Sequence, residues 1–275
     1  MSPAPASHAV VTLPALDLRP QPDHRAELGS QLLMGETVRL AAGPARKGWR
    51  RVRSEADGYD GWVREWGLVH VAAARCRRWR TAAAATVVVP FLGVATRPGS
   101  GIAVGPLFLG SRVIPGRARA GMREVELPDG RRGWVDAAGL RGPSGRRAGL
   151  IERVSSLLGV PYLWGGRTPA GLDCSAFVQL VLGEQGVSLP RDARDQCLAC
   201  RSLARSANAR EGDLAFFAVP GQAPSHVGLA LGDGYFAHSR GRVQIASIYS
   251  DNTLYDSELR PQFLGWYRPR SSPRT

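Results

Sequence analysis

The chain has 275 residues, of which 44% are hydrophobic, and it carries a formal net charge of +13. That length is about two ordinary domains, and glycine and proline stay below the fraction typical of disordered or collagen-like chains, so a folded multidomain protein is expected. Lys47 is the only lysine and lies in a turn-like segment, which excludes a phosphate-binding loop and a Schiff-base enzyme, since both need a lysine in a defined setting.

Cysteine use and the N-terminal sequence bear on the cellular compartment. Four cysteines are too few for a disulfide framework in a chain of this size. The first 25 residues lack the basic segment and apolar run of a signal peptide, and the longest apolar stretch, residues 82–95, is interrupted by Pro90 and Gly93. We therefore expect a cytoplasmic protein without a membrane segment.

The N-terminal half contains an internal repeat. Gly61-Trp62-Val63 recurs 72 residues later as Gly133-Trp134-Val135, and Gly67-Leu68 recurs as Gly139-Leu140. Short runs around each copy alternate apolar and polar residues between turn signals, which is typical of half-buried strands. The expected strands are residues 37–40, 49–53 and 61–63 in the first copy, and residues 125–127 and 133–135 in the second.

These patterns predict two small β-barrels, the first in residues 1–80 and the second in residues 81–142. Residues 72–85, rich in arginine and alanine, are expected to form a short helix or strap between them, and residues 141–147 a linker. Both repeats resemble bacterial SH3 domains, over residues 8–72 and 84–141.

Residues 148–275 have a different pattern. Apolar residues at helical spacing predict a helix over residues 150–158 that stops at Gly159, and a second helix from Cys174 to Gly183 or Gly186. Residues 213–217, 226–231 and 235–238 read as successive strands joined by glycine-rich turns. Helices followed by an antiparallel meander indicate an α+β domain.

Cys174 and two later histidines form a candidate nucleophilic site. The start of a helix lowers the pKa of a thiol, and a nearby imidazole can take its proton. A hairpin through residues 232–234 would bring His226 and His238 side by side. The alternative is structural, because a buried cysteine is more often a small core residue and a strand histidine a satisfied polar one.

Several sequence words in order strengthen the catalytic interpretation: Pro161-Tyr162-Leu163-Trp164-Gly165-Gly166, Gly171-Leu172-Asp173-Cys174-Ser175-Ala176-Phe177, Leu189-Pro190-Arg191-Asp192 and Ser225-His226-Val227-Gly228. They resemble the NlpC/P60 family of cysteine peptidases across residues 148–270. The resemblance implies a papain-like fold, with helices packed on an antiparallel sheet, behind the two SH3-like barrels. Ala176 departs from the family word, which usually has glycine there.

The resemblance also implies residue roles. Cys174 would be the nucleophile, His226 the general base, and His238 the residue that orients it. Tyr162 would direct its hydroxyl toward the thiolate and the developing oxyanion. Four residues would bind substrate close to the nucleophile, namely Asp173, Ser175, Trp164 and Ser225. No cofactor or metal is implied.

The domain order resembles one subgroup, the YkfC-type gamma-D-glutamyl-L-diamino acid endopeptidases of murein-peptide recycling. There the first barrel blocks one end of the cleft, so substrates are stem peptides with a free N-terminal L-alanine. Asp192 would hold that amine, with Tyr59 and Glu36 of the first barrel as further candidates. The alternatives are a helix N-cap for Asp192 and a solvated turn residue for Glu36.

The implied partners are thus murein stem peptides with diaminopimelate or lysine, without nucleic acid or membrane. Residues 1–80 carry 13 basic and 8 acidic side chains, residues 81–147 carry 10 and 4, and residues 148–275 carry 13 and 11. Because the excess charge lies in the barrels, an anionic-polymer binding protein stays open as an alternative, as does a secreted wall hydrolase. Cys197 and Cys200 are interpreted as one face of a helix, since no second pair supplies a zinc site.

Overall fold

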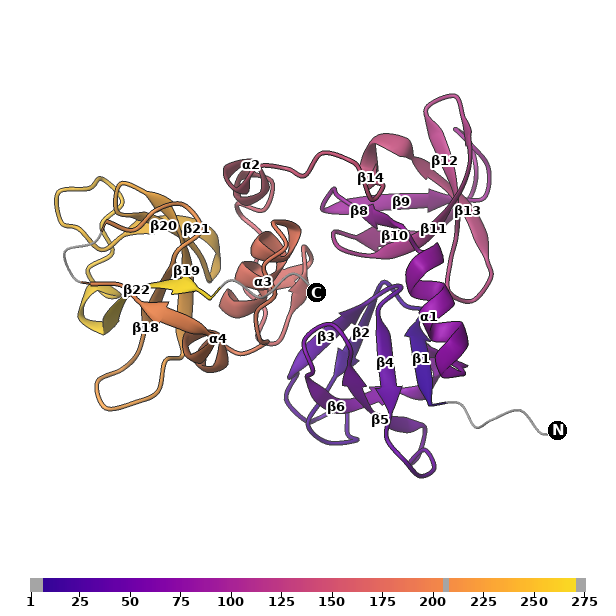
Figure 1. Ribbon diagram of the computed structural model, residues 1–275, viewed down its shortest axis with the longest axis horizontal. Helices are drawn as coiled ribbons and strands as arrows, with labels where there is room; N and C mark the ends of the chain where they lie inside the picture. Colours follow the sequence, from indigo (N-terminus) through magenta and orange to yellow (C-terminus); the bar gives the residue numbers. More distant parts are fainter. Residues whose placement is uncertain (1–6, 205–207, 271–275) are drawn as a thin grey trace. The chain divides into compact units, whose positions relative to one another are not determined.

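The computed structural model describes residues 7–204 and 208–270. The chain folds as two compact units, Met1–Arg146 (unit 1) and Arg147–Thr275 (unit 2) (Figure 1). In the described ranges, no helix combines the length and apolar character that crossing a lipid bilayer requires.

Unit 1 is built mainly from short strands. Its elements are β1 (His8–Val11), β2 (Ala15–Leu18), β3 (Ser30–Leu33), β4 (Thr37–Leu40), β5 (Trp49–Ser54), β6 (Asp60–Arg64), β7 (Leu68–Val71), α1 (Ala73–Ala82), β8 (Ala85–Val87), β9 (Phe91–Ala95), β10 (Ala103–Phe108), β11 (Arg112–Arg119), β12 (Met122–Glu126), β13 (Arg132–Asp136) and β14 (Leu140–Arg141), with 3-10 turns at Glu65–Gly67 and Ala137–Gly139. The first barrel has the sheet order β6-β5-β4-β1-β7 beside the pair β2-β3, and the second has β10-β9-β13-β12-β11-β8-β14. All of these pairings are antiparallel.

The repeated glycines have equivalent roles in the two barrels. A Cβ on Gly61 would lie 2.1 Å from Leu18 Cδ2, and one on Gly133 would lie 2.3 Å from Val94 Cγ1. A Cβ on Gly67 or Gly139 would likewise meet a leucine at the start of the barrel, at 2.6 and 2.4 Å. The sequence repeat therefore reflects positions where the backbone lies so close to a buried leucine or valine side chain that a Cβ would clash with it.

The two barrels share packing within unit 1. Met34, from the β3–β4 turn of the first barrel, is buried in the hydrophobic cluster of the second. The next residue, Gly35, has a φ of +85°, and a Cβ there would lie 2.1 Å from the Arg112 carbonyl oxygen. Arg112 N–H donates to Met34 O at 3.0 Å, and Trp79 Nε1–H of α1 donates to Gly35 O at 2.9 Å. The turn and α1 thus join the barrels.

Unit 2 packs helices on an antiparallel sheet. Its elements are α2 (Leu150–Ser155), β15 (Arg167–Thr168), β16 (Gly171–Leu172), α3 (Cys174–Glu184), α4 (Ala193–Ala199), β17 (Cys200–Ser202), β18 (Leu214–Phe217), β19 (His226–Gly232), β20 (Tyr235–Arg240), β21 (Arg242–Ser247) and β22 (Phe263–Pro269), with a 3-10 turn at Arg260–Gln262. The sheet order is β17-β22-β18-β19-β20-β21, and α3 packs against β19 and β20 (Figure 1). The α+β class and the antiparallel meander are confirmed.

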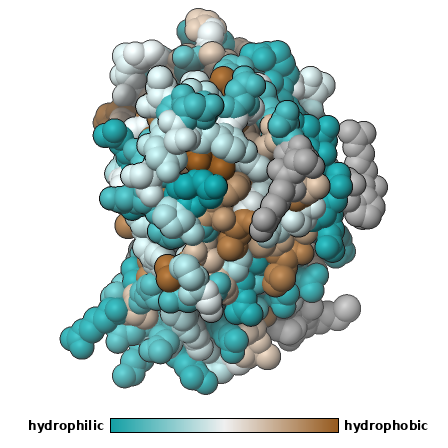
Figure 2. All heavy atoms as spheres, turned by 90° about the vertical axis from the view of Figure 1, so that its left-hand side faces the viewer, coloured by the Kyte–Doolittle hydropathy of each residue, from teal (hydrophilic) through white to brown (hydrophobic). Residues whose placement is uncertain are grey.

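The core of this sheet is aromatic. Phe216, Phe217 and Phe236 are fully buried, and Phe217 contacts Phe236 and Phe263 with ring centroids 5.3 and 5.6 Å apart. On the surface, by contrast, hydrophobic residues lie among polar ones, and on the face drawn in Figure 2 they gather near the middle. Buried aromatic rings of this size contribute much of a domain's hydrophobic stability.

Two element predictions are corrected. The helix expected over residues 150–158 ends at Ser155, because the chain tightens into a turn in which Leu157 N–H donates to Val154 O. The pair Cys197 and Cys200 does not share a helical face. Cys197 lies in the last turn of α4, whereas Cys200 begins β17 and pairs with Pro269 of β22.

Candidate active site

Cys174 occupies the first position of helix α3. The preceding residue, Asp173, is the N-cap, and its Oδ1 accepts a hydrogen bond from Ala176 N–H at 2.8 Å. An aspartate cap fixes the start of a helix by satisfying one of its unpaired N–H groups. The first N–H groups of the helix, including that of Cys174, have no partner inside the helix and can face an anion.

His226 and His238 are brought together by the β19–β20 hairpin. His226 begins β19, and His238 on β20 pairs with Gly228 in the antiparallel register. The Nε2 atom of His226 lies 2.8 Å from Nδ1 of His238, and the His238 side chain is fully buried. The adjacency predicted for these two histidines is confirmed.

The histidine pair has a preferred protonation pattern for catalysis. If His226 Nε2 carries the proton and donates to His238 Nδ1, then His226 Nδ1 is free to accept a proton from a thiol. His238 then carries its own proton on Nε2, a buried atom without a hydrogen-bond partner among the described residues.

The thiol of Cys174 lies against the strand that carries His226. Burial raises the pKa of this thiol, and backbone hydrogen bonds from Val227, the residue after His226, and from Ser175 offset part of that rise. Helix α3 packs directly on β19. The fold therefore brings the candidate nucleophile to the beginning of the strand that supplies the candidate base.

Burial favours the neutral forms of both groups. It raises the pKa of Cys174 to about 12, with the negative charge of Asp173 adding to the rise. It lowers the pKa of His226 to about 3, with smaller contributions in the same direction from His238 and Arg240. Before substrate enters, the thiol and the imidazole are therefore both neutral, and a neutral imidazole can act as a base.

A buried ion pair holds the residues on either side of Cys174. Arg191 donates from Nη2 to Asp173 Oδ2 at 2.5 Å and from Nη1 to Ser175 Oγ at 2.9 Å. Arg191 is only 2% exposed. Asp173 Oδ2 also accepts from Gly165 N–H at 3.0 Å, so one carboxylate connects the Trp164-Gly165 loop to the start of α3.

This network changes what is expected of Asp173 and Ser175. Both side chains are buried, and their hydrogen bonds lie within the protein instead of facing an open groove. Their substrate-binding assignment stays a prediction, and their observed contacts are those of residues that position the nucleophile.

Two further residues of this network have no assigned role in the sequence analysis. Besides Arg191, the fully buried Gln196 donates from Nε2 to Ser175 O and to Pro190 O, both at 3.0 Å. One feature of the sequence could have indicated a role for Arg191. It directly follows the apolar pair Leu189-Pro190, and a buried arginine usually has an acidic partner. Its partner lies 18 residues away in sequence, so the sequence alone does not name it.

Tyr162 lies close to the nucleophile. Burial raises its pKa to about 12, and the charges of Cys174 and Asp173 add to that rise. Its backbone bridges to Leu172, two residues before Cys174. The hydroxyl is therefore protonated at neutral pH and able to donate a hydrogen bond.

The remaining candidate residues of unit 2 lie further toward solvent. Trp164 is 58% exposed, and Ser225, also exposed, directly precedes His226. Asp192 is partly exposed and occupies the N-cap position of α4, yet its side chain makes no capping hydrogen bond there. The substrate-binding role of Asp192 stays a prediction.

The two candidates from the first barrel lie in unit 1. Glu36 closes the β3–β4 turn, because its Oε2 accepts from Leu33 N–H at 3.0 Å. Tyr59 packs partly buried against the core of the first barrel. Their contact with substrate stays a prediction.

Among residues 7–204 and 208–270, no group of three or more histidine, cysteine or acidic side chains is placed to hold a metal ion. Burial raises the pKa of Cys200 to about 12, the direction of an inert thiol.

Two parts of the chain match models of known protein families. Residues 159–257 match the model of the NlpC/P60 family, and residues 18–68 match the model of the bacterial dipeptidyl-peptidase SH3 domain. The chain carries an NlpC/P60 domain behind a bacterial SH3 domain. The residues that match the NlpC/P60 model include Cys174, His226 and His238.

Curated relatives of the NlpC/P60 domain are named as peptidases. A gamma-D-glutamyl-L-lysine dipeptidyl-peptidase of Bacillus subtilis is 37% identical over 127 residues, which are 45% of this chain and 43% of that protein. A probable peptidoglycan endopeptidase of the same organism, LytE, is 35% identical over 117 residues, 42% of this chain and 32% of that protein. The matches thus span less than half of either relative.

A solved structure extends the likeness to nearly the whole chain. The crystal structure of an NlpC/P60 family protein from Bacillus cereus superposes with a TM-score of 0.79, covering 95% of this chain and 99% of that one, at 20% sequence identity. This likeness supports the fold of each unit.

Proposed function

We propose that this chain is a cysteine peptidase that hydrolyses the bond between the gamma-carboxyl of D-glutamate and an L-diamino acid in murein stem peptides with a free N-terminal L-alanine. The observation that carries the proposal is Cys174 at the first position of α3, against the strand whose His226 is 2.8 Å from His238. The names of relatives matched by the NlpC/P60 domain support the substrate class.

The proposed reaction has two stages. The Cys174 proton passes to His226 Nδ1 while the sulfur attacks the gamma-carbonyl carbon, and the oxyanion accepts hydrogen bonds from Cys174 N–H and the Tyr162 hydroxyl. His226 then donates the proton to the departing amine as the C–N bond breaks. In the second stage His226 deprotonates a water molecule, whose oxygen attacks the thioester carbon. The C–S bond breaks, the acid product leaves, and the proton on His226 returns to the Cys174 sulfur.

Substrate selection is proposed to depend on Asp192. Its partly exposed carboxylate follows Arg191, whose guanidinium bonds Asp173 next to Cys174. A carboxylate at this place is a suitable partner for a protonated amine. Tyr59 and Glu36 are kept as candidates for the same amine, and the recycling role with its cytoplasmic location stays a prediction.

The chemistry can be tested by substitution of single cysteines. The parent is expected to release the diamino acid from L-Ala-gamma-D-Glu-L-Lys or its diaminopimelate counterpart. Cys174→Ala should lower kcat/KM by about 10⁴-fold or more, because the nucleophile is lost. The matched control Cys197→Ala, which removes another thiol of unit 2, should leave kcat/KM within about twofold. Equal rates for Cys174→Ala and the parent would refute the assignment.

A wall hydrolase is the second candidate, because LytE is named as a probable peptidoglycan endopeptidase. The two candidates differ in whether intact murein is a substrate. Release of soluble fragments from sacculi at a rate comparable with the tripeptide would favour this second function.

A further inference from the structure

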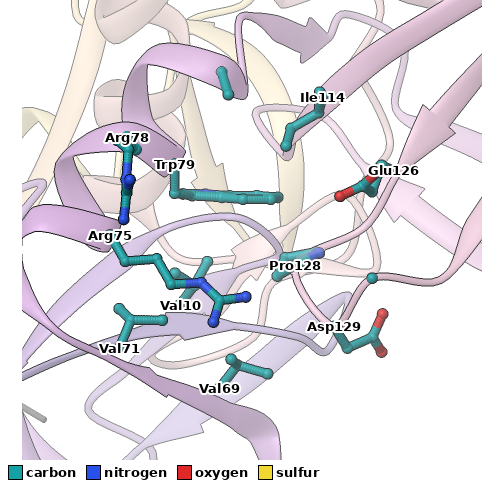
Figure 3. A pocket seen from close by; sticks show the side chains of 12 residues that line it. Val10, Val69, Val71, Arg75, Arg78, Trp79, Ile114, Glu126, Pro128 and Asp129 are labelled. Atoms are coloured by element: carbon teal, nitrogen blue, oxygen red, sulfur yellow. The ribbon is translucent and has the colours of Figure 1, made fainter. Parts of the chain in front are cut away.

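Unit 1 contains a cavity of about 520 Å³ between α1, strands β1 and β7 of the first barrel, and the β11–β13 region of the second. Its volume is within the range of small-molecule sites. Neither the proposed peptidase chemistry nor the names of the relatives account for it. Figure 3 shows its lining from close by.

One wall of the cavity is apolar and rigid. Val10 and Val71 are 2% and 5% exposed and form a small hydrophobic cluster against which Val69 and Trp79 pack. The indole of Trp79 is fixed by its hydrogen bond to Gly35 O at 2.9 Å. Such a wall is preformed, so a flat or branched apolar group would bind without ordering these side chains.

The helical periodicity of α1 places two cations at the same cavity. Arg78 and Trp79 lie three and four residues after Arg75, and Ala82 lies four and three residues after them, so all four share one helix face and line the cavity. The neighbouring face of α1 binds Glu55 instead, through Arg80 at 3.2 Å. In Figure 3 the Arg75 side chain reaches in beside Trp79, on the side of Val10 and Val69.

The charges around the cavity do not cancel. The two acidic groups that line it already have partners, since Glu126 pairs with Arg132 at 2.9 Å and Asp129 with Arg131 at 2.7 Å. Among the described residues, Arg75 and Arg78 form neither an ion pair nor a side-chain hydrogen bond. Arg75 also lies in the first turn of α1, which has no acidic residue, so the helix dipole adds to the positive potential.

We propose that this cavity is a binding site for a small carboxylate with an apolar body, the carboxylate bound by Arg75 and Arg78 and the apolar body packed between Trp79 and the valine wall. Arginine suits this role because its planar guanidinium can bind both oxygens of a carboxylate. The site lies within unit 1, and the proposal does not rest on the peptidase activity.

Binding of a matched pair of probes to the full chain tests the site. N-acetyl-L-phenylalanine carries the carboxylate, and N-acetyl-L-phenylalaninamide has the same ring without the charge. Titration calorimetry is expected to give at least about a 10-fold tighter Kd for the acid. The polar dipeptide L-Ala-gamma-D-Glu, a product of the proposed reaction, should bind this site more weakly because it has no apolar body.

Substitutions on α1 locate the binding. The double variant Arg75→Gln with Arg78→Gln should remove the preference for the acid, whereas Arg77→Gln, an exposed arginine of α1 outside the cavity lining, should preserve it. Because all three positions are exposed, the unfolding midpoints should match that of the parent. Equal binding of acid and amide by the parent, an unchanged preference in the double variant, or no binding of the acid at millimolar concentration would each overturn the proposal.

Discussion

Cys174 and His226 are both held in neutral form by burial, which raises the pKa of the thiol and lowers that of the imidazole. In the proposed mechanism the thiol therefore loses its proton to the imidazole only after substrate is bound, and no ion pair is formed beforehand. His238 has the same electrostatic tendency, since burial lowers its pKa to about 4. In the proposed mechanism His238 orients the base through its Nδ1, which lies 2.8 Å from Nε2 of His226.

This buried histidine predicts how stability depends on pH. In the unfolded chain His238 takes up a proton below its ordinary pKa near 6.5, whereas the folded chain takes it up only near pH 4. The contribution is therefore fully present above pH 6.5, and is lost at about 1.4 kcal/mol per pH unit as the pH falls toward 4. Urea unfolding of the parent at pH 7, 6 and 5 should show a falling free energy of unfolding.

The variant His238→Phe isolates this contribution. Without the titrating ring, its free energy of unfolding should fall less steeply with acidification, by about 1.4 kcal/mol per pH unit. The part of the slope due to His226, whose pKa is lowered in the same direction, should persist. Parallel slopes for the parent and the variant would contradict the assignment.

For individual residues, the sequence predicts the candidate catalytic groups better than the buried residues that position them. Cys174, His226 and His238 could be placed because a helix start and a short hairpin are local features. Arg191 and Gln196 could not be assigned, because their partners Asp173 and Ser175 lie 18 and 21 residues away. Such contacts depend on how α4 packs against α3, which periodicity does not specify.

At the scale of elements, glycines set how closely strands and turns approach. The repeated Gly-Trp-Val words were visible in the sequence, and the structure gives their reason in the close contacts of Gly61 and Gly133. The end of α2 and the position of Cys200 were predicted wrongly, because a tertiary turn and the pairing of β17 with β22 override local helical spacing.

Gly35 gives the sharpest test at this scale. Gly35→Ala should destabilise unit 1 by more than about 2 kcal/mol, since the new Cβ would meet the Arg112 carbonyl at 2.1 Å in addition to the left-handed backbone strain. Gly43 has a φ of +99° with nothing within 4 Å of its Cβ position, so Gly43→Ala isolates the backbone strain at about 1 kcal/mol. Urea unfolding measures both, and equal losses would show that the turn has room.

At the scale of the molecule, the SH3-like and NlpC/P60 parts were predictable because each has compact sequence words. The cavity of unit 1 was not, because it forms between β1 and β7 of one barrel and the β11–β13 region of the other. The charge excess of the barrels, visible from composition, includes the arginines of α1 that line this cavity. Composition does not distinguish these arginines from those that form ion pairs, such as Arg80 with Glu55 and Arg132 with Glu126. The distinction depends on how α1 packs between the barrels.

We propose that unit 2 cleaves a gamma-glutamyl bond only in stem peptides with a free N-terminus. Mass spectrometry of the products from L-Ala-gamma-D-Glu-L-Lys, from its N-acetylated form and from intact sacculi tests this directly. We expect release of the diamino acid from the free tripeptide and no fragments from sacculi. For the acetylated peptide we expect kcat/KM to be lower by about 10²-fold or more. Equal cleavage of the free and acetylated peptides, or release of fragments from sacculi, would contradict it.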